Sequence, residues 1–338
     1  MTAEDWKVSP QARALHKRSL VWDAHSCLPL RADADMQALE RHRAAGIDYV
    51  SINVGMDFNP VEQIMRVMAS FRAWLAAHPR DYALALTVED VRKAKEEGKL
   101  AVSFDLEGSD MLRGDLAMLR LYRDLGVRQI HLAYNRNNSV GGGCHDAETG
   151  LTPFGREVVA EINRLGMLMD CSHTGYKTSM EIMEISKLPV IFSHAHPVAL
   201  KKHARNIRDD QIDACAKSGG VIGINGIGIF LGDNDNSSET VLRHVDYVAE
   251  RVGAKHVGFG LDFVFQRGGD EYPPGFKRSD WWPPGNEYDT PNRRNVAPEQ
   301  MPEFTEGLLK RGYGEADISG ILGENFLRAA AATWDRRS

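Results

Sequence analysis

The sequence has few cysteines and no long apolar run. Its four cysteines, Cys27, Cys144, Cys171 and Cys215, include no CxxC pair, which argues against a disulfide scaffold and against a zinc finger. No stretch reaches the ~20 apolar residues that a membrane-spanning helix needs. The N-terminus lacks the basic start, apolar run and small-residue cleavage site of a secretory signal. These absences predict a protein of the reducing cytoplasm with no membrane partner.

An excess of positive charge is also absent. The 338 residues include 41 Lys and Arg against 47 Asp and Glu, which gives a formal net charge of -6, so nucleic acid is not an expected partner. The short basic cluster at 201–205 stands beside two acidic residues, which favours a solvated loop over a phosphate groove. P-loop, GxGxxG and G-x-S-x-G motifs are missing, and the Gly-rich SVGGGC has no following Lys, so it is expected to be a loop.

The sequence does contain a regular alternation of two patterns. Short β-branched apolar runs alternate with longer segments of helical period, as in parallel strands joined by crossover helices. A helix is expected over 60–77 and another over 153–165, where Thr152 can cap and Pro153 suits the first turn. Gly126, Gly166 and Gly219 suit the left-handed residue after a helix. The eight expected strands are 19–24, 49–54, 100–106, 127–133, 168–171, 190–193, 221–225 and 256–260.

Eight strands in strict alternation with helices predict a closed (β/α)8 barrel of the TIM type, because open doubly wound sheets usually have fewer strands. We expect one domain over 1–338, with a C-terminal helical extension from about Pro298 to Trp334. The segment 263–297 is rich in Pro, Gly, Trp and Tyr and has no apolar period. Because linkers rarely carry adjacent tryptophans such as Trp281 and Trp282, we expect an ordered lid there.

Polar residues stand at the ends of five expected strands, namely His25, Glu107, His173, His194 and Asp262. In such a barrel the active site lies at the carboxyl ends of the strands. One such residue alone is more often structural, but five convergent positions favour a common site. Three histidines and two carboxylates are costly to bury without a cation, and this donor set suits zinc or a similar ion.

A carboxylate can bridge two metal ions ~3.5–4 Å apart. A metal lowers the pKa of bound water, so such a pair would hold a hydroxide at neutral pH, and this hydroxide is the expected nucleophile. The residues alone therefore predict a metal-dependent hydrolase.

Long segments of the chain resemble the membrane (renal) dipeptidases, zinc peptidases of family M19 with amidohydrolase-like barrels. The similarity is densest in GVRQIHLAYNRNN, GLTPFGREVVAEINRLGMLMDCSHTG, VIFSHAHPVALKKHARNIRDD and HVGFGLDF, and it returns weakly in GILGENFLRAAAATW. The resemblance implies a dipeptidase with one or two Zn2+ ions and a small dipeptide-like substrate, including dipeptides with a D-residue on the C-terminal side. Dimers are common among similar enzymes, although no surface stripe in this sequence identifies a homodimer interface.

The resemblance also implies roles for individual residues. It makes Glu107 the carboxylate that bridges two zinc ions. His25 would be a ligand of one ion, and His173 and His194 would be ligands of the other. Asp262 corresponds to the residue that handles the proton and contacts the substrate's amino group. Arg205, in the basic cluster, corresponds to the arginine that binds the substrate's terminal carboxylate, which suits its fork-shaped guanidinium.

Two positions depart from the family pattern. The family's first strand normally ends in DGHND, whereas this chain has DAHSC, so Cys27 stands in place of a metal-binding Asp. Cys27 is a thiolate ligand, since zinc accepts sulfur at ~2.3 Å, or it leaves one metal site weak or empty, or it is a bystander. Tyr134 stands where the renal enzyme has a His that stabilises the oxyanion. A tyrosine hydroxyl can donate the same hydrogen bond, with Asn135 or Asn138 as additional donors.

Three functions are consistent with these residues. The leading hypothesis is a metal-dependent dipeptidase in which Arg205 holds the carboxylate and Asp262 transfers the proton. The first alternative is a related amidase or lactonase with the same centre and a different lid. The second is a non-catalytic barrel that binds a metal or ligand and is weakened by Cys27.

Overall fold

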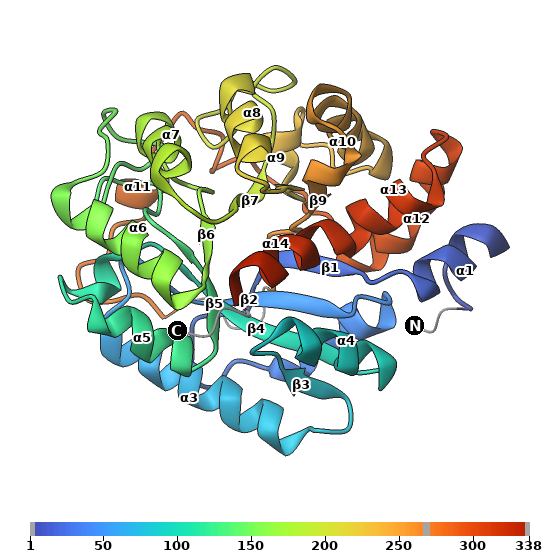
Figure 1. The fold of residues 1–338 in the computed structure, drawn as a ribbon, viewed down its shortest axis with the longest axis horizontal. Helices are drawn as coiled ribbons and strands as arrows, with labels where there is room; N and C mark the ends of the chain where they lie inside the picture. The colour runs from blue at the N-terminus through green and yellow to red at the C-terminus, as the bar shows by residue number, and fades with distance from the viewer. Residues whose placement is uncertain (1–3, 266–270, 335–338) are drawn as a thin grey trace.

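The structure, a computed structural model, describes residues 4–265 and 271–334. The described strands all pair in parallel, in the order β10-β1-β2-β4-β5-β6-β7-β8-β9, with β3 beside β4. Figure 1 shows these strands inside a ring of helices. The strands are β1 (Trp22–Cys27), β2 (Tyr49–Met56), β3 (Tyr82–Leu84), β4 (Leu100–Glu107), β5 (Val127–His131), β6 (Leu168–Asp170), β7 (Val190–Ala195), β8 (Ile222–Ile224), β9 (Val257–Phe259) and β10 (Phe263–Val264).

The helices fall into two groups. Those of the ring and its loops are α2 (Glu40–Ala44), α3 (Val61–Ala77), α4 (Val88–Glu96), α5 (Ala117–Asp124), α6 (Pro153–Leu165), α7 (Tyr176–Ile185), α8 (Asp209–Lys217), α9 (Gly228–Leu231), α10 (Ser238–Val252) and α11 (Arg278–Trp281). Those near the chain ends are α1 (Pro10–Arg18), α12 (Met301–Lys310), α13 (Glu315–Ser319) and α14 (Asn325–Trp334), the last two joined by a π-helical turn at Gly320–Glu324. No helix among the described residues combines the length and apolar character needed to cross a membrane.

Local sequence signals explain where the ring helices begin and end. At the start of α6 the Thr152 hydroxyl accepts a hydrogen bond from the Gly155 backbone N–H at 2.9 Å, and Pro153 occupies the first turn. The helix ends at Gly166, whose φ of 69° is in the left-handed region. The prediction of a helix over 153–165 is therefore confirmed.

All eight expected strands are present, with boundaries that differ by at most three residues, and the TIM-type barrel is confirmed. Two additional strands, β3 and β10, were not predicted. β10 has only two residues, and β3 lies off the main path of the sheet, where it pairs only with β4. β3 pairs with Leu100–Val102 at the start of β4, before β5 begins to pair at Phe104.

Asp23 joins the first strand of the barrel to the chain that follows β9. Its Oδ1 accepts a hydrogen bond from the Leu261 backbone N–H at 2.8 Å, and its Oδ2 lies 3.0 Å from His42 Nε2. The Asp262 backbone N–H donates to the His25 carbonyl at 2.8 Å, and β10 then pairs with β1. The last strands thereby return to the first and carry Asp262 next to His25.

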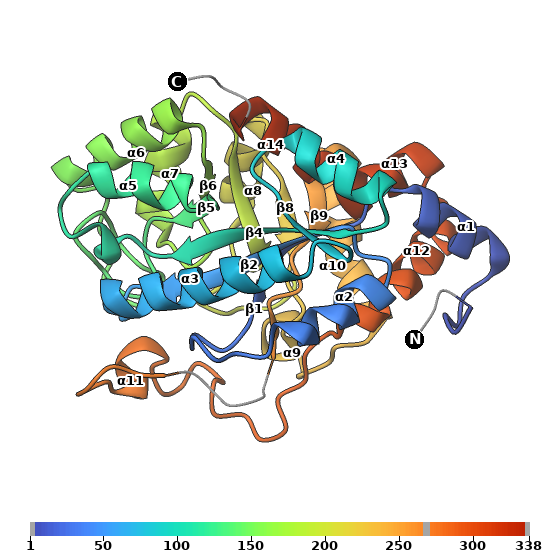
Figure 2. The same ribbon diagram turned by 90° about the horizontal axis from the view of Figure 1, so that it is seen from below.

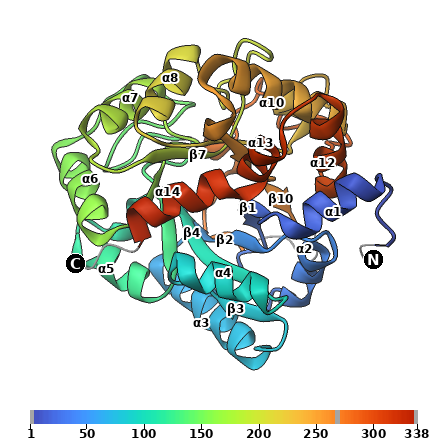
Figure 3. The same ribbon diagram turned by 45° about the vertical axis from the view of Figure 1, so that its right-hand side comes forward.

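The C-terminal helices cover the amino ends of the strands, as Figure 3 shows for α14. The Trp334 ring of α14 lies 5.7 Å from the Trp22 ring at the start of β1, and the Phe326 ring lies 6.3 Å from it. Trp22 also stacks on Tyr49 at the start of β2, with 3.5 Å between the ring centroids. This buried aromatic group closes one end of the barrel and leaves the carboxyl ends of the strands for function. The expected C-terminal helical extension is confirmed.

The segment 271–297 crosses the carboxyl ends of the strands, and Figure 2 shows the part with α11 along one side of the molecule. Side chains from α3 and from two loops hold its backbone. Gln63 Nε2 donates to the Glu271 carbonyl at 2.7 Å, Asn135 Nδ2 donates to Trp281 at 2.8 Å, and His203 Nε2 lies 2.9 Å from the Asn286 carbonyl. Within the predicted lid, 263–297, residues 266–270 lie outside the described residues.

Candidate metal centre

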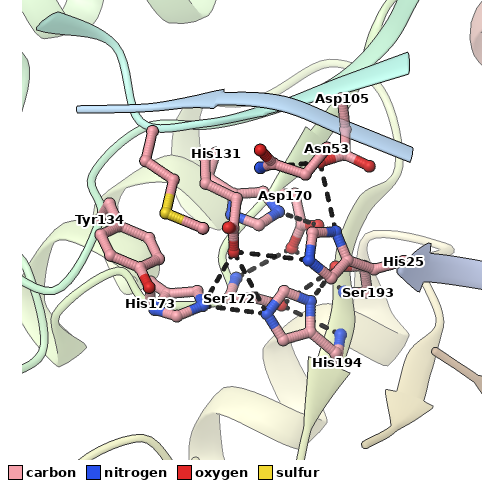
Figure 4. Close-up of polar contacts among 12 residues, drawn as sticks. His25, Asn53, Asp105, His131, Tyr134, Asp170, Ser172, His173, Ser193 and His194 are labelled. Carbon is pink, nitrogen blue, oxygen red and sulfur yellow. Dashed lines mark hydrogen bonds and ion pairs between the residues drawn. The ribbon is translucent and has the colours of Figure 1, made fainter. Parts of the chain in front are cut away.

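The five residues at the strand ends come together, with the three histidines around one carboxylate oxygen of Glu107 and Asp262 beside His25. Glu107 Oε1 lies 3.0 Å from His173 Nε2, 3.6 Å from His25 Nε2 and 3.7 Å from His194 Nε2. Asp262 Oδ1 lies 3.8 Å from His25 Nε2. None of these residues is more than 7% exposed. Figure 4 shows the histidine rings facing one another in the interior of the barrel.

Two residues of this centre have an unusual backbone. His173 and Asp262 have φ angles of 65° and 51°, in the left-handed region that side chains other than glycine rarely adopt. Such a conformation costs about 1–2 kcal/mol per residue. Neighbouring contacts maintain it, because the His173 carbonyl accepts from the Cys144 backbone N–H at 2.9 Å and the Asp262 N–H donates to the His25 carbonyl. This backbone strain therefore occurs at the two positions whose side chains must point into the barrel.

Each histidine of the centre has its Nδ1 next to a polar partner. Asp105 Oδ1 lies 3.2 Å from His25 Nδ1, Asn135 Oδ1 lies 2.7 Å from His173 Nδ1, and Ser193 Oγ lies 2.7 Å from His194 Nδ1. Because each Nδ1 faces one of these partners, the Nε2 lone pair of each ring can bind a metal ion at the centre. Metal-ligating histidines in proteins usually have this arrangement.

A divalent ion fits these donors. The Nε2 atoms of His173 and His194 are 3.0 Å apart, and burial together with nearby cations lowers the pKa of both rings well below 6.5. A shared proton is therefore disfavoured, and two facing lone pairs repel unless a cation lies between them. Burial also raises the pKa of Glu107 to about 7, although His25 and His131 oppose it.

Three groups of the described side chains could hold such an ion. Within each group the possible ligand atoms lie within 4.8 Å of one another. The groups are Glu107 with His173 and His194, Glu107 with His25 and Cys27, and His131 with His25 and His194. Cys27 Sγ lies 3.3 Å from His25 Nε2, and burial raises the pKa of the thiol. The thiol is thus placed where a ligand would stand.

Arg205 lies in the loop after β7 and is only 3% exposed. Its Nη2 donates to the His194 carbonyl at 3.3 Å, and its Nε has no hydrogen-bond partner. No carboxylate in residues 4–265 or 271–334 lies within 4.0 Å of this guanidinium. Arg205 lines a cavity of about 580 Å3, which it shares with His173 of the centre.

A second cavity, of about 430 Å3, lies directly over the centre. Tyr134 lines it, and the tyrosine ring lies 4.3 Å from that of His173. Burial raises the pKa of Tyr134 well above 10, so its hydroxyl keeps its proton. Other lining residues include Cys27, Met56, Glu107, His173, Ile227, Phe230, Asp262, Trp282 and Tyr288.

The two asparagines proposed as additional oxyanion donors have other partners. Asn138 Nδ2 donates to Asp57 Oδ2 at 3.0 Å and to the Leu132 carbonyl at 2.8 Å. Asn135 bridges His173 and the Trp281 carbonyl. Both side-chain amides thus already take part in hydrogen bonds with neighbouring groups.

Three buried polar residues near the centre were not predicted from the sequence. His131 ends β5, Asn225 Nδ2 donates to Asp262 Oδ2 at 2.8 Å, and Asp57 accepts the Tyr134 backbone N–H at 2.9 Å. His131 and Gln129 are two residues apart in β5, whose sequence is VRQIH. Polar residues at this spacing point to the same side of a strand, a signal that could have identified His131.

A closed parallel barrel with buried histidines and carboxylates at the carboxyl ends of its strands defines the class of metal-dependent hydrolase barrels. Residues 9–283 match the model of the membrane dipeptidases, peptidase family M19, and the chain belongs to this family. The resemblance found in the sequence is thereby confirmed.

Curated relatives and solved structures agree with this assignment. The chain is 31% identical over 250 residues to the dipeptidase tcpJ of Claviceps purpurea, covering 72% of this chain and 54% of the relative. It is 36% identical over 179 residues to an uncharacterized dipeptidase of Schizosaccharomyces pombe, covering 50% of this chain and 42% of the relative. The chain thus spans about half the length of the curated relatives it matches.

Among solved structures, an amidohydrolase from Pseudomonas aeruginosa superposes with a TM-score of 0.84 at 27% identity, covering 96% of this chain and 99% of the other. A metallo peptidase from Rhodobacter sphaeroides, liganded with a phosphinate mimic of the dipeptide L-Ala-D-Ala, has a TM-score of 0.73 at 23% identity, covering 94% and 100%. The second likeness concerns the fold alone.

Proposed function

We propose that the protein is a metal-dependent dipeptidase. The observation that carries the proposal is Arg205, a buried guanidinium with no carboxylate partner among the described residues, which shares a cavity with His173. An unpaired buried cation is costly, so the site is suited to an anionic ligand. The terminal carboxylate of a dipeptide supplies that anion next to the scissile bond, where the metal ligands lie. A longer peptide would place its carboxylate too far from this bond.

Zinc suits the donors of the centre, which combine imidazole, carboxylate and thiol groups. Glu107, His173 and His194 would hold one ion, and His25, Cys27 and Glu107 would hold the second. When bound, the ions would lower the pKa of a water molecule and polarise the carbonyl of the scissile bond.

Asp262 is the proton carrier in this proposal. Its carboxylate takes the proton from the attacking water and gives it to the leaving amine, and it also contacts the substrate's amino group. Burial raises the pKa of Asp262 against the opposing effects of His25 and Arg205, which brings proton uptake and release closer to neutral pH. The hydrogen bond from Asn225 Nδ2 at 2.8 Å keeps the carboxylate oriented.

Tyr134 would stabilise the negative charge that develops on the substrate's carbonyl oxygen. Its protonated hydroxyl is a donor in a dry cavity, where such hydrogen bonds are strongest. We also propose that 263–297 acts as a lid within a single domain of residues 1–338. Trp282 and Tyr288 of this segment line the cavity over the centre, where they would exclude water from it.

The test is hydrolysis of a dipeptide panel by zinc-loaded protein. The panel pairs L-Xaa-L-Xaa with L-Xaa-D-Xaa substrates and includes L-Ala-D-Ala, because a Rhodobacter sphaeroides metallo peptidase binds a mimic of it. C-terminal amides and N-acetylated dipeptides serve as substrate controls, and Glu107→Gln serves as the inactive protein control. We expect turnover of free dipeptides only. No turnover by the wild type or by Cys27→Asp, with metal bound, would overturn the proposal.

A further inference from the structure

His131, the last residue of β5, is a fourth histidine in the centre. It is fully buried, and its Nδ1 lies 3.8 Å from Glu107 Oε1. Its ring centroid lies 5.8 Å from that of His25 and 5.4 Å from that of His194. Figure 4 shows the His131 ring on the same side of the barrel interior as the other three rings. Glu107 Oε1 is therefore within 4 Å of a nitrogen from each of four histidines.

Asp170 determines which nitrogen of His131 faces the centre. Asp170 Oδ2 lies 2.7 Å from His131 Nε2 and also accepts from Gln129 Nε2 at 2.9 Å. Its Oδ1 accepts from the backbone N–H groups of Ser172 at 2.9 Å and Ser193 at 3.1 Å. With the His131 Nε2–H directed at the Asp170 carboxylate, the Nδ1 lone pair of His131 faces Glu107 and the centre.

His131 and Asp170 form a histidine–carboxylate pair like that of His25 and Asp105. The two pairs differ in which ring nitrogen faces the carboxylate. In His25 the carboxylate faces Nδ1 and Nε2 is left for the centre, whereas in His131 the carboxylate faces Nε2. A histidine that ligates a metal usually donates its other ring N–H to a carboxylate or a similar acceptor. The ligand-capable nitrogens of His25, His131 and His194 lie within 4.8 Å of one another, and all three residues are buried.

We propose that His131 is an additional ligand, through Nδ1, of the ion that His25, Cys27 and Glu107 would hold, and that Asp170 supports it. The inference rests on the proposed metal-dependent function and adds a ligand to it. It also bears on Cys27, which stands where the family has a carboxylate ligand. A further imidazole in reach of the same ion would help to retain that ion without the carboxylate.

Metal binding by variants tests this role. His131→Gln keeps an N–H group that can face Asp170 and removes the imidazole. His244→Gln is the matched control, because His244 is a fully buried histidine of α10 whose Nε2 lies 2.9 Å from the Leu231 carbonyl, outside the centre. Zinc content after equilibrium dialysis, zinc affinity by competition with a chromophoric chelator, and the visible spectrum of the Co2+-loaded protein are measured for each variant. Circular dichroism checks that each variant is folded.

We expect His131→Gln to bind its weakest zinc at least tenfold less tightly and to have an altered Co2+ spectrum, while His244→Gln matches the wild type. Asp170→Asn should weaken metal binding by about 10–100-fold, as expected for a residue that supports a ligand. Wild-type affinity and spectrum in His131→Gln would overturn the inference and leave the dipeptidase proposal standing. A wild-type chain that binds no metal would overturn both.

A crystal of zinc-loaded wild type gives a test that does not depend on the folding of a variant. Anomalous differences at the zinc edge locate each ion. An ion about 2.0–2.1 Å from His131 Nδ1 is the expected result, since this is the length of a zinc–imidazole bond. An ion beyond bonding distance, with His131 paired only to Asp170, would mean that His131 serves as a buried counterion instead.

Discussion

The Nε2 atoms of His173 and His194 face each other at a distance of 3.0 Å. The side chain of Asn135 forms a hydrogen bond with Nδ1 of the His173 ring and so orients this ring. In the proposed centre, the Asn135 amide would therefore support a metal ligand. We expect Asn135→Gly to weaken zinc binding by about 10–100-fold. Glycine suits the Asn135 φ of 60°, so the loss of the amide is separated from backbone strain.

The measurement is zinc affinity by chelator competition, with Asn163→Gly as the control. Asn163 is a buried asparagine of α6 whose side chain donates to the Val159 carbonyl, away from the centre. Equal zinc affinity in Asn135→Gly and wild type would show that Asn135 does not orient His173.

Cys27 has a spectroscopic signature if it is a thiolate ligand. Co2+-loaded wild type should have a near-ultraviolet sulfur-to-cobalt charge-transfer band, and Cys27→Ser should lack it. Cys215→Ser should retain the band, because Cys215 lies on α8 and donates to the Val190 carbonyl. If the wild type lacks the band while Cys27→Asp raises both metal content and rate, then Cys27 leaves one metal site weak.

Arg205→Ala should raise KM for free dipeptides by about 30-fold or more, because removing one partner of a buried charge pair costs roughly 2–5 kcal/mol. The corresponding C-terminal amides should be affected far less. Arg208→Ala is the matched control, since Arg208 belongs to the same loop and pairs with the exposed Glu148 at 3.0 Å. An equal increase in KM for acids and amides would remove the carboxylate-binding role of Arg205.

The sequence predicted the barrel because each strand of the ring has a clear apolar run bounded by turn residues. It also predicted which residues would meet at the centre, because parallel strands bring their carboxyl ends to one side. Glu107, the last residue of β4, and His194, near the end of β7, are found there as expected.

What the sequence could not predict depends on contacts between distant segments. The spacing of His131 and Gln129 indicates that both point to one side of β5, but it is the barrel that shows this side to face Glu107. The partners of Asn138 are likewise set by the loop after β2, which brings Asp57 to its amide. Periodicity indicates to which side of a strand a residue points. It does not indicate which polar groups from other loops lie on that side.

Gly108 should be far less replaceable than Gly98. Both have positive φ, 121° and 69°. A Cβ at Gly108 would lie 2.1 Å from Asp57 Oδ1, whereas a Cβ at Gly98 would meet nothing within 4 Å. Asp57 cannot easily move away, because it accepts the backbone N–H groups of Ser109 at 2.7 Å and Tyr134 at 2.9 Å.

We therefore expect Gly108→Ala to lower the free energy of unfolding by at least ~2 kcal/mol more than Gly98→Ala, as overpacking adds to backbone strain. Urea unfolding followed by circular dichroism measures the difference. Equal effects of the two substitutions would show that the loop after β4 can shift away from Asp57.

His16 gives the protein a pH-dependent stability that is separate from the metal centre. Its Nδ1 lies 2.7 Å from Thr305 Oγ1 of α12, and its Nε2 lies 3.0 Å from the Ala45 carbonyl. Burial is the main cause that lowers the pKa of His16 from 6.5 to about 4, and Lys95 adds to it. Between these two pH values only the unfolded chain takes up the proton. The native state therefore loses stability as the pH falls through this range, and this loss ends below the folded pKa.

His16→Gln removes this titration. Wild type should be the more stable protein at pH 7, and its advantage over His16→Gln should shrink by about 2 kcal/mol between pH 7 and pH 5. Urea unfolding at both pH values, with a chelator present so that metal release does not contribute, measures the change. If the advantage of the wild type were constant over this range, the neutral, buried state of His16 would not be the source of the pH dependence. The contact of α1 with α12 would then stabilise the fold through packing alone.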